Sequence, residues 1–188
     1  PNKSIACSFI LEQVFNLKSF NFHALTVPIS IVRGIKKHLG IEVSIKWPND
    51  IVYNNKKLAG ILIESVKCKT GYLFNIGIGI NVNEAPQDFP PELTGHATSL
   101  KIINNNTIQR EPLLATILNE LDDLISNCNY DTISCDWMKH CSHINQNVQF
   151  KFNSENISGV FTQINSNGQA VIKKESQKIL YDGAVQVL

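Results

Sequence analysis

Hydrophobic and polar residues alternate most regularly over residues 75–83, which read NIGIGINVN. The even positions are all β-branched and apolar, whereas the odd positions carry only glycine or asparagine. Because side chains point alternately to the two faces of a β-strand, this run predicts a strand with one apolar face and one face of glycines and amides. A strand that gives up side chains on one face leaves room for another group to approach its backbone. The pattern therefore predicts a ligand-binding strand.

Three stretches have the spacing of amphipathic helices instead. Over residues 21–40, apolar side chains recur at steps of three and four, basic residues lie near the end, and Gly40 is the expected stop. We expect Pro28 in the first turn of this helix. Residues 107–127 repeat the pattern, with Thr107 as the expected N-cap. Residues 131–140 predict a shorter helix with Trp137 on its buried face.

The other apolar runs before residue 143 have the length of strands. They cover residues 4–14, 43–46, 51–53, 57–65 and 72–82. The pair Asn54-Asn55 tolerates positive φ and predicts a hairpin turn, and residues 69–71 predict the next turn. These runs indicate an antiparallel meander with at least one helix packed against it. Residues 84–95, rich in Pro, Asp and Glu, predict a surface loop.

The character of the chain changes after Ile144. Short runs of alternating polarity are separated by turn signals at residues 153–156, 165–168 and 182–183. This indicates a small all-β unit over residues 144–188. Such a unit is small for an independent core, so we expect it to pack on the larger domain.

Composition narrows the function classes. The 188 residues carry a formal net charge of +1, which argues against electrostatic binding of nucleic acid. No apolar run is long enough to span a bilayer, and no signal peptide opens the chain. The five cysteines form no CxxC pair and are interpreted as reduced cytosolic thiols. Cys135, His140, Cys141 and His143 fit no standard zinc spacing, and no residue is assigned to a metal.

Three motifs carry a resemblance. KWPND at residues 46–50, KLAGILIE at 57–64 and GIGINVN at 77–83 occur in the order and near the spacing of the biotin protein ligase family, and FPPEL followed by ATSL is typical of its segment that orders over the adenylate. The chain resembles this family over nearly its whole length. The resemblance implies an α+β fold with a mixed, mostly antiparallel sheet, as in class II aminoacyl-tRNA synthetases. It also implies a catalytic domain over residues 1–143, N-terminally incomplete, and an SH3-like β-barrel over residues 144–188.

The resemblance also implies an ATP-dependent ligase, a biotin–[acetyl-CoA-carboxylase] ligase. Biotin is activated as biotinyl-5′-AMP and then transferred to a lysine of a biotin carboxyl carrier protein of acetyl-CoA carboxylase or a similar enzyme, with biotin and ATP as substrates and Mg²⁺ as cofactor. By family match Lys57 is the catalytic residue that contacts the biotin carboxylate and the phosphate. A lysine suits this task because its three N–H groups can face both anions. Lys57 could otherwise be a solvated turn lysine.

Other motif positions match family residues around the same substrates. The biotin-binding positions are Lys57, Gly60, Leu62 and Gly77, and the nucleotide-binding positions are Lys46, Asn49 and Asn81. Lys46 could instead extend into solvent at a strand end, and Asn49 could simply form a turn. Asp50 could balance a lysine, assist Mg²⁺ or cap the turn. No covalent nucleophile is needed, so Cys7 and Cys68 are expected to be spectators.

Strict alternation conflicts with one part of this assignment. It places Lys57 on the opposite strand face from Gly60 and Leu62. If all three contact one substrate, the strand must carry a bulge or kink near Gly60.

Several alternatives remain open from the sequence. The same chemistry could act on lipoate or octanoate, or the chain could be a non-catalytic module that binds biotin or a carrier. The glycine- and arginine-rich loop that folds over biotin in this family does not occur in the sequence. A ligase that also represses transcription would need an upstream helix-turn-helix. A cytoplasmic location is expected, without a membrane or nucleic-acid partner, and an exposed sheet edge could pair two subunits as a homodimer.

Overall fold

The computed structural model describes residues 3–13, 18–69, 71–152 and 155–187. Its larger part contains a five-stranded sheet with the strand order β1-β5-β4-β3-β2, in which every ladder is antiparallel. The strands are β1 (Ile5–Gln13), β2 (Ser44–Lys46), β3 (Asp50–Tyr53), β4 (Lys56–Cys68) and β5 (Gly71–Ile80). The predicted meander is confirmed, including the turn at Asn54 and Asn55, whose φ angles are 47° and 61°. The predicted turn at 69–71 includes a residue outside the described ranges.

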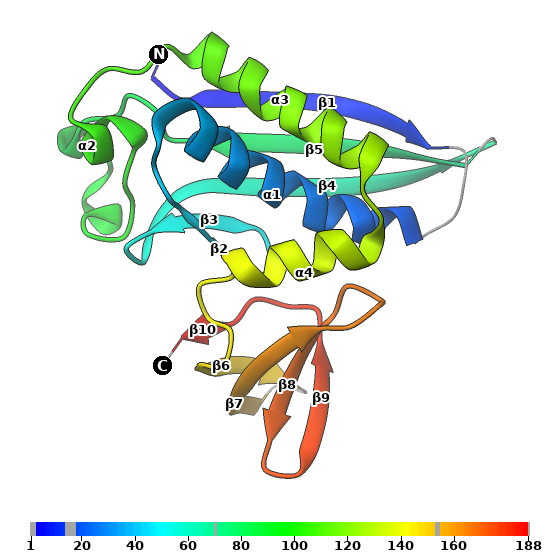
Figure 1. The fold of residues 1–188 in the computed structure, drawn as a ribbon. Coiled ribbons are helices and arrows are strands. Elements are labelled where there is room, and N and C mark those ends of the chain that lie inside the picture. Colours follow the sequence, from blue (N-terminus) through cyan, green and yellow to red (C-terminus); the bar gives the residue numbers. More distant parts are fainter. Residues whose placement is uncertain (1–2, 14–17, 70, 153–154, 188) are drawn as a thin grey trace.

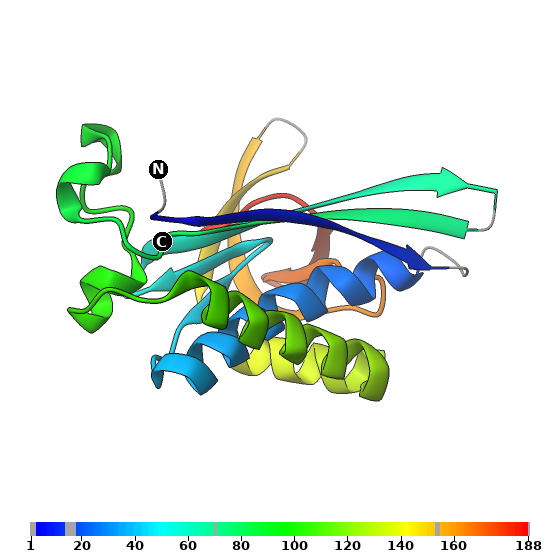
Figure 2. The same ribbon diagram turned by 90° about the horizontal axis from the view of Figure 1, so that it is seen from above.

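Helices cover one face of this sheet. Helices α1 (Lys18–Leu39), α3 (Arg110–Asn127) and α4 (Tyr130–His140) all lie on the same side of it (Figures 1 and 2). The apolar face predicted for residues 75–83 points towards them, since Ile76, Ile78 and Ile80 are at most 3% exposed. Burying this face supplies the main driving force for the α-on-β packing. The glycine face therefore lies on the other side, away from the three helices.

Two predicted helix starts were wrong. Helix α1 begins at Lys18, so Pro28 lies inside it rather than in its first turn. Helix α3 begins after Gln109, so Thr107 is not its N-cap. The sequence analysis also missed the short helix α2 (Leu100–Asn104), which begins after Ser99; the Ser99 side chain accepts a hydrogen bond from the Ile102 amide. The predicted loop before α2 contains two short 3₁₀ helices, η1 (Pro86–Asp88) and η2 (Pro91–Leu93).

Helices α1 and α3 cross at a glycine. A Cβ atom added to Gly34 would lie 2.6 Å from Cγ1 and 2.9 Å from Cα of Ile117, so a side chain there would push the helices apart. We expect Gly34→Ala to destabilise the protein by about 1–3 kcal/mol, because overpacking outweighs the gain in helix propensity. Urea denaturation would measure this, with Ser126→Ala at an exposed site of α3 as control. A variant as stable as the wild type would show that the crossing relaxes freely.

A second antiparallel sheet follows α4. It has the strand order β10-β6-β7-β8-β9. Its strands are β6 (Asn147–Phe152), β7 (Glu155–Ile164), β8 (Ala170–Lys174), β9 (Gln177–Tyr181) and β10 (Gln186–Val187). This agrees with the small all-β unit expected from the sequence. The strand order does not establish the SH3-like barrel, which stays a prediction, as do the domain boundaries.

The two sheets meet at an aromatic cluster. The ring centroid of Trp47 lies 5.9 Å from that of Trp137 and 6.0 Å from that of Phe161. The Trp47 indole also donates a hydrogen bond to the carbonyl of Gly183, at 2.8 Å. His143 packs edge-on against Phe161. Trp47 of the KWPND motif is thus fixed to the second sheet.

Two fully buried histidines make stability depend on pH. Burial lowers the pKa of His23 and of His143 from 6.5 to about 4. Above pH 6.5 both histidines are neutral in the folded and the unfolded protein, and the free energy of unfolding is at its full value. As the pH falls from 6.5 towards 4, only the unfolded protein takes up the protons, so the free energy of unfolding decreases by at most about 1.4 kcal/mol per pH unit for each histidine. Urea midpoints measured between pH 7 and 5 would show this decline. His143→Phe should flatten the decline and exposed His96→Gln should not; an unchanged slope in His143→Phe would contradict the assignment.

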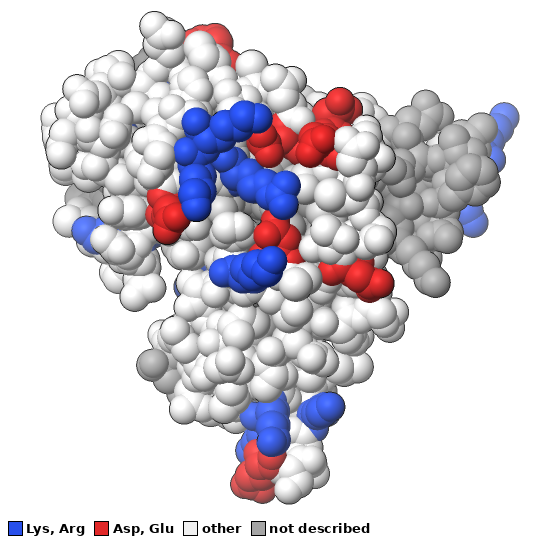
Figure 3. Space-filling model, in the orientation of Figure 1, with Lys and Arg blue, Asp and Glu red and all other residues white. Residues whose placement is uncertain are grey.

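Charges on the helical face are mixed in sign. Lysine and arginine lie next to acidic residues over α1 and α4 (Figure 3). Arg33 pairs with Asp136, Lys36 with Glu42, and Lys37 with Glu120. Basic side chains on this face are therefore partly balanced by acidic neighbours. In the described part of the chain, no helix is both long and apolar enough to cross a bilayer.

Candidate active site

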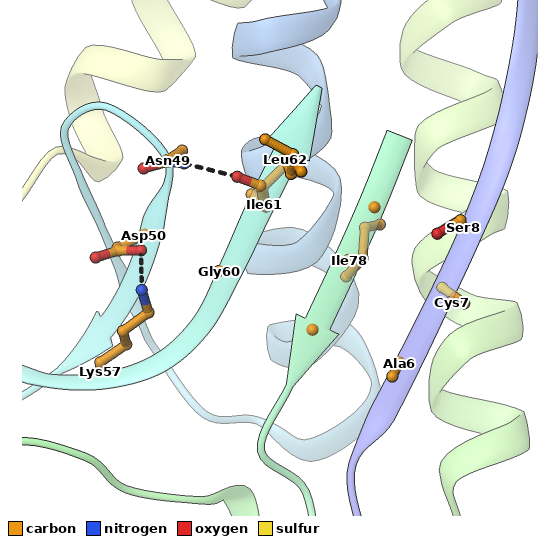
Figure 4. A pocket seen from close by; sticks show the side chains of 12 residues that line it. Ala6, Cys7, Ser8, Asn49, Asp50, Lys57, Gly60, Ile61, Leu62 and Ile78 are labelled. Atoms are coloured by element: carbon orange, nitrogen blue, oxygen red, sulfur yellow. Dashed lines mark hydrogen bonds and ion pairs between the residues drawn. The ribbon is translucent and has the colours of Figure 1, made fainter. Parts of the chain in front are cut away.

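A hollow of about 580 Å³ lies on the sheet face away from the helices. Its floor is a row of small residues from three neighbouring strands (Figure 4). Gly60 of β4 is opposite Gly79 of β5, which is opposite Ala6 of β1; Gly77 is opposite Ser8 in the same way. The face of glycines predicted from the sequence therefore continues across the sheet.

The β5 glycines keep this hollow open. A Cβ atom added to Gly77 would have no neighbour closer than 3.8 Å, and one added to Gly79 none closer than 3.9 Å. A side chain at either position would thus be compatible with the fold, but it would project into the hollow. Glycine is required here for the space above the strand and not for the backbone conformation.

A bulge brings Lys57 to this face. Ile51 pairs with Ala59, but the next residue of β3, Val52, pairs with Lys57. The residue of β4 between Lys57 and Ala59 therefore has no partner in the ladder. Directly paired residues point to the same face, and Lys57 consequently joins the face of Gly60 and Asp50. The bulge predicted near Gly60 is confirmed.

The Lys57 side chain lies over Gly60 and pairs with Asp50. Its ammonium is 2.6 Å from Oδ1 of Asp50, and a Cβ atom added to Gly60 would lie 3.3 Å from Cε of Lys57 (Figure 4). The lysine side chain is 54% exposed, so this ion pair contributes little to stability. Of the three roles considered for Asp50, the balancing of a lysine is the one this contact supports. The result is a positive charge at the mouth of a hollow with a glycine floor.

Asn49 is anchored beside the same hollow. The side-chain amide of Asn49 donates to the backbone carbonyl of Ile61 at 2.7 Å, and the backbone carbonyl of Asn49 accepts from the backbone amide of Ile61 at 3.0 Å. These bonds attach Asn49, the last residue of the connection between β2 and β3, to β4. Lys57, Gly60, Leu62, Gly77 and Asn49, five of the seven predicted site residues, line the hollow together.

Asn81 and Lys46 do not line the hollow. Asn81 donates through its side chain to the Thr98 carbonyl at 3.0 Å, next to the point where the Thr98 amide bonds the Lys57 carbonyl at 2.9 Å. Lys46 is paired with Asp50 in the β2–β3 ladder, and its charge contributes, after burial, to the lowered pKa of His143. Asn81 thus lies beside the backbone of Lys57, and the roles of both residues stay predictions.

The sequence analysis missed the contribution of β1. Ala6, Cys7 and Ser8 line the hollow, as does Gly79. Gly79 belongs to the alternating pattern that was recognised, but nothing in the sequence shows which strand pairs with β5. Burial raises the pKa of the Cys7 thiol, in keeping with its expected role as a spectator.

Metal ligands are not gathered anywhere in the described ranges. No group of three or more His, Cys, Asp or Glu side chains there is placed to hold an ion. Cys141 and His143 do lie together, with 3.6 Å between Sγ and Nδ1, but burial raises the pKa of this thiol to about 12. The pair is therefore neutral and not an activated nucleophile.

Comparison with known sequences points to one family. Residues 1–83 match the model of the biotin/lipoate A/B protein ligase family. The chain is 41% identical over 113 residues to the bifunctional ligase/repressor BirA of Bacillus subtilis. This aligned region covers 59% of this chain and 34% of that protein. It is 35% identical over 81 residues to a biotin–[acetyl-CoA-carboxylase] ligase of Mycobacterium tuberculosis, covering 43% and 27%. The matched region thus spans about a third of these relatives.

Solved structures share the whole fold. The apo biotin protein ligase of Aquifex aeolicus superposes with a TM-score of 0.83 at 21% identity, covering 99% of this chain and 83% of that one. The same enzyme in complex with biotin and ATP gives a TM-score of 0.78 at 23% identity, covering 99% and 79%. At these identities the likeness shows the fold.

Proposed function

Because the chain belongs to the biotin/lipoate A/B protein ligase family, we propose that it is the core of a biotin–[acetyl-CoA-carboxylase] ligase. The observation that carries the proposal is the ammonium of Lys57 over the small-residue floor of an open hollow. A flat apolar substrate with a terminal carboxylate fits this arrangement. Its body would lie over Gly60, Gly77 and Gly79, and its carboxylate would meet Lys57.

The first step joins biotin to AMP. A carboxylate oxygen of biotin attacks the α-phosphorus of ATP, and the bond to the β-phosphate oxygen breaks to release pyrophosphate. Two anions must approach each other, and charge builds up on the phosphate oxygens in the transition state. The ammonium of Lys57 lowers this barrier when it lies beside both the biotin carboxylate and the α-phosphate. On substrate binding it would leave Asp50 and place its positive charge next to these two anions. Asn49 and Asn81 would hold the nucleotide through amide donors and acceptors.

The second step transfers biotin to the carrier. The uncharged amine of a carrier lysine attacks the carbonyl carbon of biotinyl-5′-AMP, the bond from carbon to phosphate oxygen breaks, and AMP leaves as the nitrogen loses a proton. The product is an amide on a biotin carboxyl carrier protein of acetyl-CoA carboxylase or a similar enzyme. We place the reaction in the cytoplasm.

The residues of the hollow fit Mg²⁺ that arrives with ATP. Mg²⁺ is commonly bound by substrate phosphates with one or two carboxylates. Asp50 is the acidic side chain among those that line the hollow, and binding of substrate to Lys57 would release its carboxylate. When bound, the ion would neutralise phosphate charge.

Pyrophosphate exchange tests the choice of acid. The complete protein is incubated with ATP, labelled pyrophosphate and one of biotin, lipoate or octanoate. We expect exchange with biotin and little with the other two acids. Preferential exchange with lipoate or octanoate would assign the same chemistry to the alternative substrate, and absence of exchange with all three would leave the non-catalytic module.

A further inference from the structure

The loop over residues 85–98, between β5 and α2, is closed at its base by Ser99. Both 3₁₀ helices of this loop are exposed, whereas the Ser99 side chain is 0% exposed. Its hydroxyl donates a hydrogen bond to the backbone carbonyl of Glu84 at 2.6 Å and accepts one from the Ile102 amide, at the start of α2. Ser99 does not line the hollow. It therefore joins the two ends of an exposed loop without facing the candidate site.

The C-terminal end of this loop is bonded to the backbone of Lys57. The Lys57 amide donates to the His96 carbonyl at 2.8 Å, and the Lys57 carbonyl accepts from the Thr98 amide at 2.9 Å. Ala97 is thereby paired with Lys57 in a parallel bridge. The ladder between β4 and β5 begins at Ala59. At Lys57 the loop therefore takes the place of a neighbouring strand on this side of β4.

Lys57 depends on this support because it lies next to the bulge. The following residue, Leu58, has no partner in the β3–β4 ladder. A bulge interrupts the regular ladder that otherwise fixes the direction of the side chains. The two bonds from the loop hold the Lys57 backbone where this ladder is interrupted. Misplacing a catalytic group by about 1 Å costs about 10²-fold in rate, so the position of this backbone matters for the chemistry.

The bond made by Ser99 keeps the loop in the position that Lys57 requires. At the C-terminal end of the loop, the Asn81 side chain donates to the Thr98 carbonyl at 3.0 Å, and the Leu100 amide donates to the Asn81 carbonyl at 3.1 Å. The Ser99 hydroxyl attaches the N-terminal end, at Glu84, to the same point. Loss of this bond lets the two ends of the loop separate, and the bonds of the loop to Lys57 are weakened.

We propose that Ser99 is a positioning residue for Lys57. Its hydroxyl closes the loop over residues 85–98, and the closed loop holds the Lys57 backbone beside the bulge. Ser99 acts through the loop and contacts no substrate. The inference rests on the proposed function for its effect on the reaction, whereas the coupling between Ser99 and the Lys57 backbone can be measured without substrates.

Substitutions of Ser99 separate its bond to Glu84 from its effect on α2. Ser99→Ala and Ser99→Gly both remove this bond, and Ser99→Gly keeps most of the stability of α2, because glycine is accepted at helix N-caps. Ser99→Thr keeps a hydroxyl that can make both bonds. Asn129→Ala is the matched control. Asn129 is the N-cap of α4 and accepts from the Thr132 amide, so this variant loses a helix cap but no loop closure.

Amide hydrogen exchange of the complete protein, without substrates, measures the coupling. Losing one hydrogen bond corresponds to about tenfold in a local opening equilibrium. We expect the amides of Lys57 and Thr98 to exchange about tenfold faster in Ser99→Ala and Ser99→Gly. Both amides should exchange at wild-type rates in Ser99→Thr and Asn129→Ala. Unchanged exchange of these two amides in Ser99→Gly overturns the proposal.

Biotin-dependent pyrophosphate exchange by the complete protein measures the consequence for the reaction. We expect kcat to fall about tenfold in Ser99→Ala and Ser99→Gly, and to stay normal in Ser99→Thr and Asn129→Ala. Because Ser99 acts through Lys57, adding Ser99→Gly to Lys57→Ala should cause little further loss.

Three kinetic outcomes overturn the proposal. They are a normal kcat in both Ser99→Ala and Ser99→Gly, an equal fall in Asn129→Ala, and an additive loss when Ser99→Gly is combined with Lys57→Ala. In the last case the loop would act without the lysine. Absence of pyrophosphate exchange in the wild type is a failure of the proposed function itself, and the hydrogen-exchange rates of Lys57 and Thr98 then decide whether Ser99 holds the lysine.

Discussion

Lys57→Ala is expected to lower the rate of adenylate formation by about 10²-fold or more, because it removes the positive charge that opposes the charge developing on carboxylate and phosphate. The substitution leaves the fold intact, since the lysine side chain is 54% exposed and only pairs with Asp50. The measurement is biotin-dependent pyrophosphate exchange by the complete protein. The KM for biotin should rise as well, because the same ammonium meets the substrate carboxylate.

Lys56 provides a matched control for this prediction. It is the preceding lysine of β4, is exposed, and does not line the hollow. Lys56→Ala should exchange pyrophosphate like the wild type. If Lys57→Ala exchanged pyrophosphate at the normal rate, Lys57 would have no part in the chemistry. If Lys56→Ala and Lys57→Ala lost exchange activity to a comparable extent, the total positive charge of the hairpin, and not Lys57 in particular, would account for the activity.

Gly77→Leu is expected to raise the Kd for biotin about 10- to 100-fold without unfolding the protein. No atom lies within 3.8 Å of a Cβ atom at this position, so the leucine side chain enters the hollow and displaces the substrate. Misfit of this kind costs about 1–3 kcal/mol, and each 1.4 kcal/mol corresponds to a factor of ten. Isothermal titration with biotin would measure the loss, and thermal unfolding would show the intact fold.

Asn75 lies two residues before Gly77 on the same face of β5 and is the matched control. It is exposed, and its amide contacts Glu64 rather than the hollow. Asn75→Leu introduces the same side chain and should bind biotin normally. Normal binding by Gly77→Leu would mean that the substrate does not lie on the glycine floor.

The sequence predicted those parts of the fold that follow from local periodicity. The strand predicted over residues 75–83 was recognised with the correct buried face, because alternation has a direct geometric meaning in a strand, although β5 already ends at Ile80. The hairpin at Asn54-Asn55 followed from residues that tolerate positive φ. The runs of alternating polarity predicted after residue 144 lie at 148–152, 159–161, 170–172 and 184–187, so strand β9 was missed; most of its side chains are polar or partly exposed, and only a partner strand fixes its conformation.

Non-local pairing explains what the sequence could not give. The bulge next to Lys57 was inferred from a conflict between alternation and a shared substrate, but its place opposite Ile51 and Val52 depends on the β3–β4 register. The contribution of Ala6 and Ser8 depends on which strand lies beside β5. Pro28 was placed at a helix start because proline lacks a donor, whereas the packing of α1 on the sheet keeps the helix continuous through it.

The central claim is that this site activates biotin for transfer to a carrier lysine with the help of Lys57. The most direct test incubates the complete protein with ATP, Mg²⁺, biotin and a carrier domain, and follows the mass of the carrier by mass spectrometry. We predict attachment of one biotin to one carrier lysine by the wild type, and about 10²-fold slower attachment by Lys57→Ala. Failure of the wild type to modify the carrier, or equal rates in the two proteins, would contradict the account.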